Sequence, residues 1–163
     1  MSFDGVVRGV KDDDLNSPHD AQRYQLGSRH FKNGNEYVYV YNAGGSSIGT
    51  GKYCVLDGGA NSLSSGYSVT VTNASLTGRM AGVAQSTLTA AQYGFVMTRG
   101  TSLVACDAGE ISCNVGVDLC LGTDGGFRPV AASLSVGEIF AHTMNSFVTT
   151  VGTSKARIFD SLL

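Results

Sequence analysis

The sequence of 163 residues has no tryptophan, only two prolines and few charged side chains. Charged residues make up 15% of the chain, against roughly 25% in a typical soluble domain. Long surface helices need Glu, Lys, Arg and Ala in quantity, so a mainly helical fold is not expected. Glycine is abundant instead, with 22 residues, and together with many Ser, Thr and Val residues it favours short strands joined by tight turns.

Further absences exclude whole classes of partner. The net charge is -2, so there is no basic excess to neutralise phosphates, and nucleic acid is not an expected partner. No apolar run approaches the roughly 20 residues of a membrane helix, so no membrane partner is expected either. Residues 1–10 carry Asp4 and Arg8 and lack the apolar segment of a signal peptide. We therefore expect a protein that is made and used in a cytosol.

Charge is unevenly distributed along the chain. It is dense from residue 1 to 36, a stretch that includes the run Asp12-Asp13-Asp14. From residue 37 to 98 the only charged residues are Lys52, Asp57 and Arg79. The break predicts an extended polar N-terminal arm followed by a compact domain.

We place this arm at residues 1–35 and the compact domain at residues 36–163. The apolar residues of the arm are too sparse to form a core of their own: Val6, Val7, Val10 and Leu15. Two interpretations stay open. The arm is either a disordered tail or a segment that becomes ordered against a neighbouring subunit.

The compact domain is expected to consist of strands. Residues 36–41, Glu-Tyr-Val-Tyr-Val-Tyr, alternate Tyr with Val, the clearest period-2 pattern in the chain. Further strands are predicted at residues 52–56, 67–72, 80–84, 93–99, 101–106, 117–122, 127–130, 137–144 and 155–159. Turn signals recur roughly every eight to twelve residues, as in a sandwich or barrel, so the predicted class is all-β.

Candidate catalytic and metal-binding patterns are weak. Gly45-Ser-Ser47-Ile-Gly49 matches the G-x-S-x-G pattern, but that motif needs a helix after the serine, and a strand is predicted next. The histidines show no metal-ligand spacing with each other or with a cysteine: His19, His30 and His142. We therefore expect no enzymatic activity, no metal and no cofactor.

The cysteines are interpreted as buried thiols. Cys106, Cys113 and Cys120 lie seven residues apart, not at the two-to-four spacing of zinc knuckles. Cys54 stands alone. Cytosolic thiols usually stay reduced, although the even number of cysteines leaves pairing open.

Tyr37, Tyr39 and Tyr41 fall on one side of the predicted strand. If exposed, they would form a platform for a sugar or a base, but the basic surround that a base platform needs is missing. Tyrosine is also common in half-buried strands and at protein interfaces. Packing in the core or at an interface is therefore favoured over a ligand platform.

Several segments resemble a known family. Tyr24-Gln-Leu-Gly-Ser-Arg29, followed by residues 33–40, Asn-Gly-Asn-Glu-Tyr-Val-Tyr-Val, is similar to the opening of head decoration (cement) proteins of tailed bacteriophages. Ala81-Gly-Val-Ala-Gln85 and residues 91–100, Ala-Gln-Tyr-Gly-Phe-Val-Met-Thr-Arg-Gly, are similar to their central segment. Residues 116–122 and 128–130 resemble the stretch before the final strands. The resemblance covers about residues 24–160, and the longer acidic start departs from it.

The resemblance implies a small β-barrel or β-tulip domain on the outside of a phage head. Its partners would be the major capsid protein and further copies of itself, most often as a trimer, with no small-molecule substrate. Such a protein would be made in the host bacterial cytoplasm and would stabilise the shell without catalysing a reaction. We expect the contacts with capsid and subunits at Val6, Val7, Val10, Leu15, Tyr24, Leu26, Tyr37, Tyr39 and Tyr41.

Two other hypotheses remain. One is a receptor- or carbohydrate-binding β module of a phage tail or fibre, supported by the tyrosines and the glycine-rich loops. The other is a small hydrolase, which depends on Ser47 alone.

Overall fold

The computed structural model describes residues 9–57, 66–71, 80–106, 118–122, 125–129, 141–143 and 153–158. These residues form a short helix, α1 (Asp12–Leu15), and ten strands. The strands are β1 (Arg29–Lys32), β2 (Asn35–Asn42), β3 (Tyr53–Leu56), β4 (Ser68–Val71), β5 (Met80–Ala84), β6 (Tyr93–Ala105), β7 (Asp118–Leu121), β8 (Phe127–Pro129), β9 (Ala141–Thr143) and β10 (Thr153–Ile158). The predicted all-β class is confirmed.

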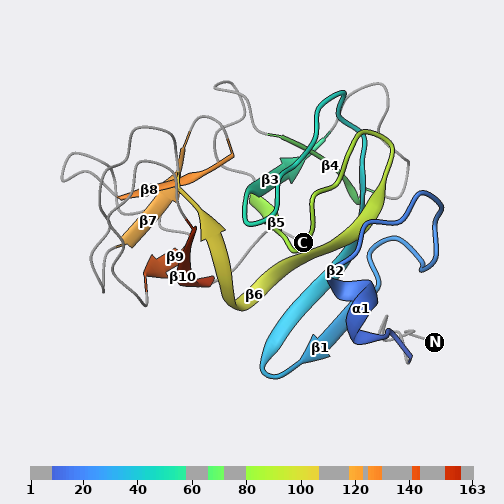
Figure 1. Ribbon diagram of the computed structural model, residues 1–163, viewed down its shortest axis with the longest axis horizontal. Helices are drawn as coiled ribbons and strands as arrows, with labels where there is room; N and C mark the ends of the chain where they lie inside the picture. Colours follow the sequence, from blue (N-terminus) through green and yellow to red (C-terminus); the bar gives the residue numbers. More distant parts are fainter. Residues whose placement is uncertain are drawn as a thin grey trace.

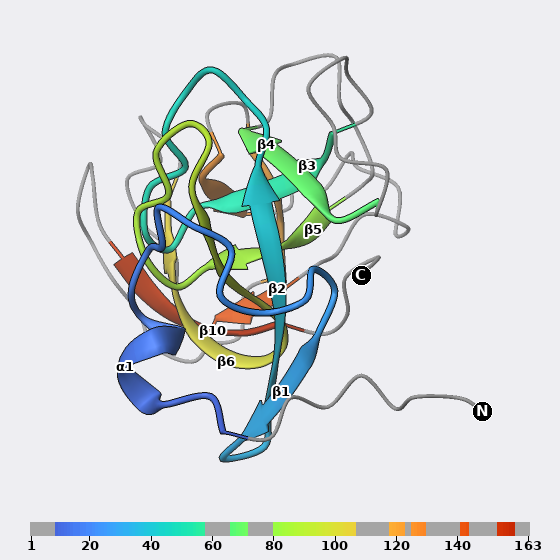
Figure 2. The same cartoon turned by 90° about the vertical axis from the view of Figure 1, so that its right-hand side faces the viewer.

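Five strands close into a small barrel in the order β2-β4-β3-β5-β6, with β6 returning to β2 (Figure 2). β2 and β4 run parallel, and the other neighbours in the barrel run antiparallel. Closure leaves none of these five strands with a fully free edge. The predicted β-barrel is therefore confirmed.

β6 belongs to two sheets at once. Its first half pairs with β2 up to Arg99, and its second half pairs with β10 from Gly100 onward. β10 pairs with β9, β9 with β7, and β7 with β8, and together they form a second sheet beside the barrel (Figure 1). The sequence predicted two strands here, whereas the structure has one strand of 13 residues. The strand continues through Gly100 because glycine adopts its φ of 124° without a side-chain clash.

Two apolar clusters fill the molecule. One draws small side chains from all five barrel strands and fills the narrow barrel interior, including Val38, Cys54, Val69, Ala81 and Val96. The other covers the outer face of the barrel and reaches the second sheet, including Tyr39, Tyr53, Phe95, Leu119 and Phe127. Both faces of β2 are therefore buried, which explains its buried valines as well as its buried tyrosines.

The N-terminal segment of residues 9–28 lies across the outside of the barrel. Val10 and Leu15 belong to the outer apolar cluster, and His19 forms an antiparallel bridge with Tyr93 of β6. β1 then joins β2 in a hairpin, so the arm boundary predicted at residue 35 falls at the first residue of β2. The change in charge density marks where the sequence becomes apolar, but backbone pairing continues across it.

The remaining strand predictions match within a few residues wherever the structure describes them. Residues 80–84 match β5 without a shift, while β1 was not predicted. The strand predicted at residues 137–144 lies partly outside the described residues. Within the part of the chain described, no helix has the length and apolarity needed to cross a membrane.

Candidate functional site

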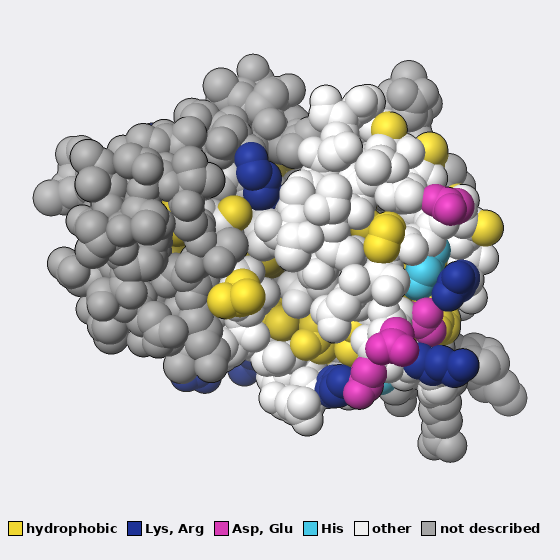
Figure 3. Space-filling view, in the orientation of Figure 1, with side chains coloured by type: hydrophobic (Ala, Val, Ile, Leu, Met, Phe, Trp, Pro, Cys, Tyr) yellow, Lys and Arg dark blue, Asp and Glu magenta, His cyan; other side chains and the backbone are white. Residues whose placement is uncertain are grey.

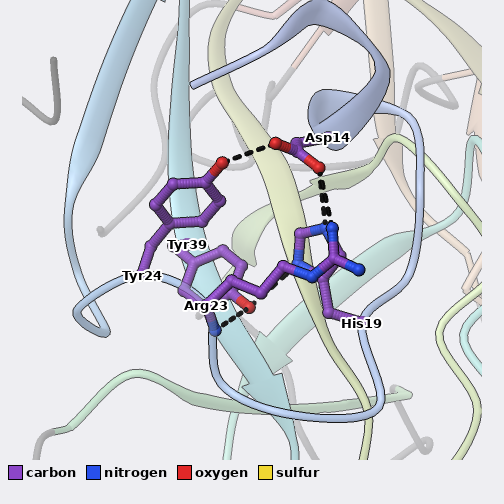
Figure 4. A network of polar contacts seen from close by, with 5 residues as sticks. All are labelled: Asp14, His19, Arg23, Tyr24 and Tyr39. Carbon is purple, nitrogen blue, oxygen red and sulfur yellow. Dashed lines mark hydrogen bonds and ion pairs between the residues drawn. The ribbon is translucent and has the colours of Figure 1, made fainter. Parts of the chain in front are cut away.

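The most concentrated polar cluster lies where the N-terminal segment meets the barrel (Figure 4). Asp14, in α1, accepts a hydrogen bond from the Tyr24 hydroxyl at 2.6 Å and another from the Arg23 guanidinium at 3.1 Å. Nε2 of His19 lies 3.5 Å from the same carboxylate. The single turn of α1 buries Leu15, and that anchors Asp14 beside these three partners.

Tyr39 of β2 forms the other side of this cluster. Its hydroxyl lies 2.9 Å from Nδ1 of His19 and accepts a hydrogen bond from the backbone N–H of Arg23 at 3.2 Å. Nδ1 of a neutral imidazole can accept the Tyr39 hydroxyl proton, while the buried Nε2 faces Asp14 without a hydrogen-bond partner among the described residues. The five residues thus form one connected network that fastens the N-terminal segment to the barrel.

The electrostatics of the network favour a fixed arrangement over proton transfer. The hydrogen bond from Tyr24 lowers the pKa of Asp14, and burial lowers the pKa of His19. Burial, followed by the bond to Asp14, raises the pKa of Tyr24 to about 12. Burial also raises the pKa of Tyr39. At neutral pH both tyrosines keep their protons and Asp14 stays ionised, so the cluster acts as a structural clamp.

The structure distributes the nine predicted interface residues between the core and the surface. Four are buried against their own chain: Val10, Leu15, Tyr37 and Tyr39. Three are half-buried and retain some surface: Tyr24, Leu26 and Tyr41. Val6 and Val7 lie outside the described residues. A buried side chain contacts its own fold, so only the half-buried residues are candidates for a contact in this conformation.

The burial of the tyrosines on β2 decides between packing and a ligand platform. Tyr37 is 8% exposed and Tyr39 is fully buried, so the packing interpretation is confirmed for both and neither forms an open ligand platform. The half-buried Tyr41 lies beside Tyr93, with ring centroids 4.9 Å apart. The alternation with valine on β2 arises because both of its faces are covered.

The other candidate residues lie apart from this network. Ser47 is exposed in the loop after β2, and the next element is the strand β3, not the helix that a nucleophile elbow requires. Cys54, Cys106 and Cys120 are buried, and Cys113 lies outside the described residues. Among the residues described, no group of three or more His, Cys, Asp or Glu side chains is arranged to hold a metal ion.

Sequence reasoning missed the network itself. In the sequence, Asp14 stands out only as part of a run of three acids, and His19 only as a histidine without a metal-ligand spacing. No spacing rule connects these residues to Tyr39, because they meet only when the N-terminal segment crosses the barrel. The available signal was weak: a histidine, an arginine and a tyrosine close together in the polar stretch just before the Tyr-Val strand.

Charged groups on the surface gather along one edge. In Figure 3, acidic and basic side chains alternate at one side of the molecule, and a broad area of the described surface is uncharged. Three ion pairs join charged side chains of the described residues: Asp12 with Lys32, Asp14 with Arg23, and Glu36 with Arg29. The uncharged area agrees with the almost charge-free stretch of the sequence.

Comparisons with known proteins show a likeness of fold and none of sequence family. No protein-family model matches the sequence, and no curated protein matches it. The fold is similar to that of the N base of the head fiber gp8.5 of bacteriophage phi29, with a TM-score of 0.55 and 16% sequence identity. The match covers 78% of this chain and 98% of that chain. At this identity, the similarity establishes a shared fold.

Proposed function

We propose that this protein is a structural component of a tailed-phage virion that binds the head. The observation that carries the proposal is the shared fold with the base domain of a phage head fiber, across almost the whole of that domain. The sequence resemblance to head decoration proteins supports the same location. It is a separate line of support, because it depends on short sequence motifs, whereas the shared fold depends on the course of the backbone.

In its specific form, the proposal is a decoration (cement) protein on the outer surface of the capsid. There it would contact the major capsid protein, stabilise the lattice and associate with further copies of itself, with a trimer favoured. No catalytic turnover, cofactor or small-molecule substrate forms part of this role. A lattice presents many equivalent sites, so several modest contacts per oligomer combine into tight overall binding.

The surface supports a role in protein contact. Its broad uncharged area would be a solubility hazard on an isolated molecule and suits a face that is covered in an assembly. Tyr41 and Tyr93 offer half-buried aromatic rings of the type enriched at protein interfaces. The clamp between His19 and Tyr39 keeps the N-terminal segment in place, so residues 9–28 present a defined surface to a partner.

The direct test uses heads that lack this protein. Purified chain is added to such heads, and bound material is measured by co-sedimentation and by electron cryomicroscopy of the particles. We expect saturable binding at regular positions on the outer shell, and a higher temperature for heat-induced release of packaged DNA. Heads that bind none of the chain would refute the proposed location, and bound heads with unchanged heat resistance would refute the cementing role.

A second candidate is a receptor- or carbohydrate-binding module of a tail or fibre. It is favoured by one observation, that the similar fold belongs to a fiber protein. Burial of Tyr37 and Tyr39 removes its main support from the sequence. Immunogold labelling distinguishes the two candidates: label on the tail together with binding to a glycan array, competed by free sugar, would select this one.

A further inference from the structure

A groove opens where the barrel meets the second sheet. Its volume is about 510 Å³, and it lies between the β1–β2 turn, the middle of β6 and the end of β10. Asn33 and Gly34 form the turn with φ values of 51° and 78°, the pattern of a tight two-residue hairpin. The groove therefore follows from the way in which one long strand joins the two sheets.

Two arginines give the groove a positive charge. Arg99 of β6 and Arg157 of β10 line it, and both are exposed. Within the described part of the chain, neither arginine forms an ion pair. Glu36, the acidic residue in the lining, is already paired with Arg29. A protein with a net charge of -2 thus presents two exposed guanidinium groups in one depression, neither of them paired with an acid among the described residues.

The groove also displays an aromatic ring. Phe31 of β1 belongs to the lining and is 58% exposed, one of two large apolar side chains with high exposure among the described residues. Ile158 also belongs to the lining, but its side chain is almost completely buried, so Phe31 is the apolar group that a partner would meet. An exposed aromatic ring next to arginines has the composition of an interface hot spot, where Arg and aromatic residues carry most of the binding energy.

Asn35, in the lining of the groove, forms hydrogen bonds with other residues of the same chain. The side-chain oxygen of Asn35 accepts a hydrogen bond from the Thr101 backbone N–H at 2.9 Å, and its amide group donates to the Tyr37 hydroxyl at 3.2 Å. The oxygen and the amide nitrogen of Asn35 each already have a partner within the chain. The positively charged donors in the lining are the two arginines, whose planar guanidinium groups match carboxylates in two-point contacts.

We propose that this groove binds an extended acidic segment of a head protein, with carboxylates on Arg99 and Arg157 and an apolar side chain against Phe31. This inference rests on the proposed function and names the surface through which it acts. Nucleic acid fits less well, because two arginines on a chain of net negative charge are few for a phosphate backbone.

A head protein is favoured as the occupant over a second copy of this chain, because most of the acidic residues that the structure describes already have a partner. Their partners within the chain are Lys32 for Asp12, Arg23 for Asp14, Gln92 for Asp20 and Arg29 for Glu36. A copy that supplied carboxylates to the groove would have to break such contacts. A separate protein with free acidic residues would bind without breaking any of these contacts.

The first experiment measures binding to heads that lack this protein. We expect the double variant Arg99→Gln/Arg157→Gln to bind at least tenfold more weakly than the wild type, and added salt to weaken wild-type binding more than that of the variant. Lys11→Gln removes an exposed positive charge outside the groove and should stay within twofold of the wild type. All variants should keep the wild-type circular dichroism spectrum, since these side chains are exposed.

A matched apolar pair tests the role of the ring. Phe31→Ser should weaken binding to heads about fivefold. Leu103→Ser removes the other large exposed apolar side chain, which is 60% exposed and lies outside the groove lining, and should change binding less than twofold. Wild-type affinity in both Phe31→Ser and the double arginine variant would overturn the inference while leaving the proposed function intact.

A defined peptide separates failure of the groove from failure of the proposed function. A fluorescent peptide of alternating Glu and Leu is titrated with the wild-type chain, next to a peptide with Gln in place of Glu. Selective binding of the Glu peptide, lost in the double arginine variant, supports the groove even if heads prove not to be its target. No binding of either peptide, together with no effect of the variant on heads, overturns it.

Two further measurements examine other occupants. If the double variant loses affinity for a single-stranded DNA oligonucleotide and keeps wild-type affinity for heads, the groove binds nucleic acid and the inference is overturned. Sedimentation velocity measures self-association. If the double variant no longer self-associates but keeps wild-type affinity for heads, the occupant is a second copy, and the inference is overturned as well. Unchanged values in both measurements, with weakened binding to heads, support it.

Discussion

The hydroxyl of Tyr39 lies 2.9 Å from Nδ1 of His19, and both side chains are almost completely buried. The contact joins residues 20 positions apart, one in the polar N-terminal segment and one in strand β2 of the barrel. The segment that looks least like a folded domain in sequence is thus held by one of the most buried polar contacts in the described structure.

Removal of this hydroxyl should loosen the N-terminal segment. In Tyr39→Phe, the buried Nδ1 of His19 loses its donor, and the part-buried backbone N–H of Arg23 loses its acceptor. We expect the free energy of unfolding to fall by about 1–3 kcal/mol. Urea denaturation measures this loss. Hydrogen exchange should show faster exchange in residues 14–24.

Tyr41→Phe is the matched control for this prediction. Tyr41 lies on the same strand, is half-buried, and makes no side-chain hydrogen bond among the described residues. Its stability should therefore stay within about 0.5 kcal/mol of the wild type. Equal losses in the two variants would show that the cost comes from aromatic packing and not from the network.

Acid should weaken the same network. Burial lowers the pKa of His19 below its usual 6.5, and the Tyr24 hydrogen bond lowers the pKa of Asp14 below 3.8. In both cases the unfolded chain binds protons more readily than the folded chain. The free energy of unfolding therefore decreases as the pH decreases. The His19 contribution is complete above pH 6.5 and is lost as the pH falls through its lowered pKa, while the Asp14 contribution is lost below pH 3.8.

A non-titrating substitution isolates the histidine. In His19→Asn, we expect the free energy of unfolding to change less steeply between pH 6.5 and pH 4 than in the wild type, although the variant is less stable at pH 7. His30→Asn, a substitution in β1 away from the clamp, serves as the histidine control. Urea titrations at several pH values give the slopes, and an unaltered slope in His19→Asn would contradict the assignment.

Cys54 should be chemically silent in the folded protein. Its thiol is fully buried in the barrel interior, and burial raises its pKa to about 12. The reactive thiolate is therefore scarce at pH 8, and reagents cannot reach the sulfur without opening the barrel. Iodoacetamide labelling, followed by mass spectrometry, should modify Cys54 at least 100-fold more slowly in buffer than in 8 M urea. Comparable rates would show that the barrel opens easily.

The barrel could be predicted from the sequence because its strands carry strong local signals. The Tyr-Val alternation of residues 36–41 gave β2, and the apolar segment of residues 80–84 gave β5. β1 was missed because its four residues, Arg-His-Phe-Lys, are mostly polar and do not alternate. The Asn33-Gly34 dipeptide that follows is a strong hairpin signal and could have located it.

The candidate site was less predictable, for a physical reason. Residues of the clamp and the groove come together only through tertiary packing, so no local pattern connects Asp14 with Tyr39, or Phe31 with Arg157. Burial of both faces of β2 was equally hidden, because alternation normally marks one exposed face. The predicted interface therefore included side chains such as Tyr37 and Tyr39 that the fold uses internally.

The bend of β6 at Gly100 is expected to be the most sensitive backbone position of the fold. Its φ of 124° is rarely adopted by other residues, and an added Cβ would come within 2.1 Å of the Asn35 side-chain oxygen. Gly100→Ala should lower the free energy of unfolding by about 1–3 kcal/mol from backbone strain alone. Gly45→Ala, where φ is not positive and nothing lies within 4 Å, should be close to neutral. Denaturation midpoints measure both. Since Asn35 also holds the Thr101 backbone, a wild-type midpoint in Gly100→Ala would mean that the two sheets tolerate rearrangement at their junction.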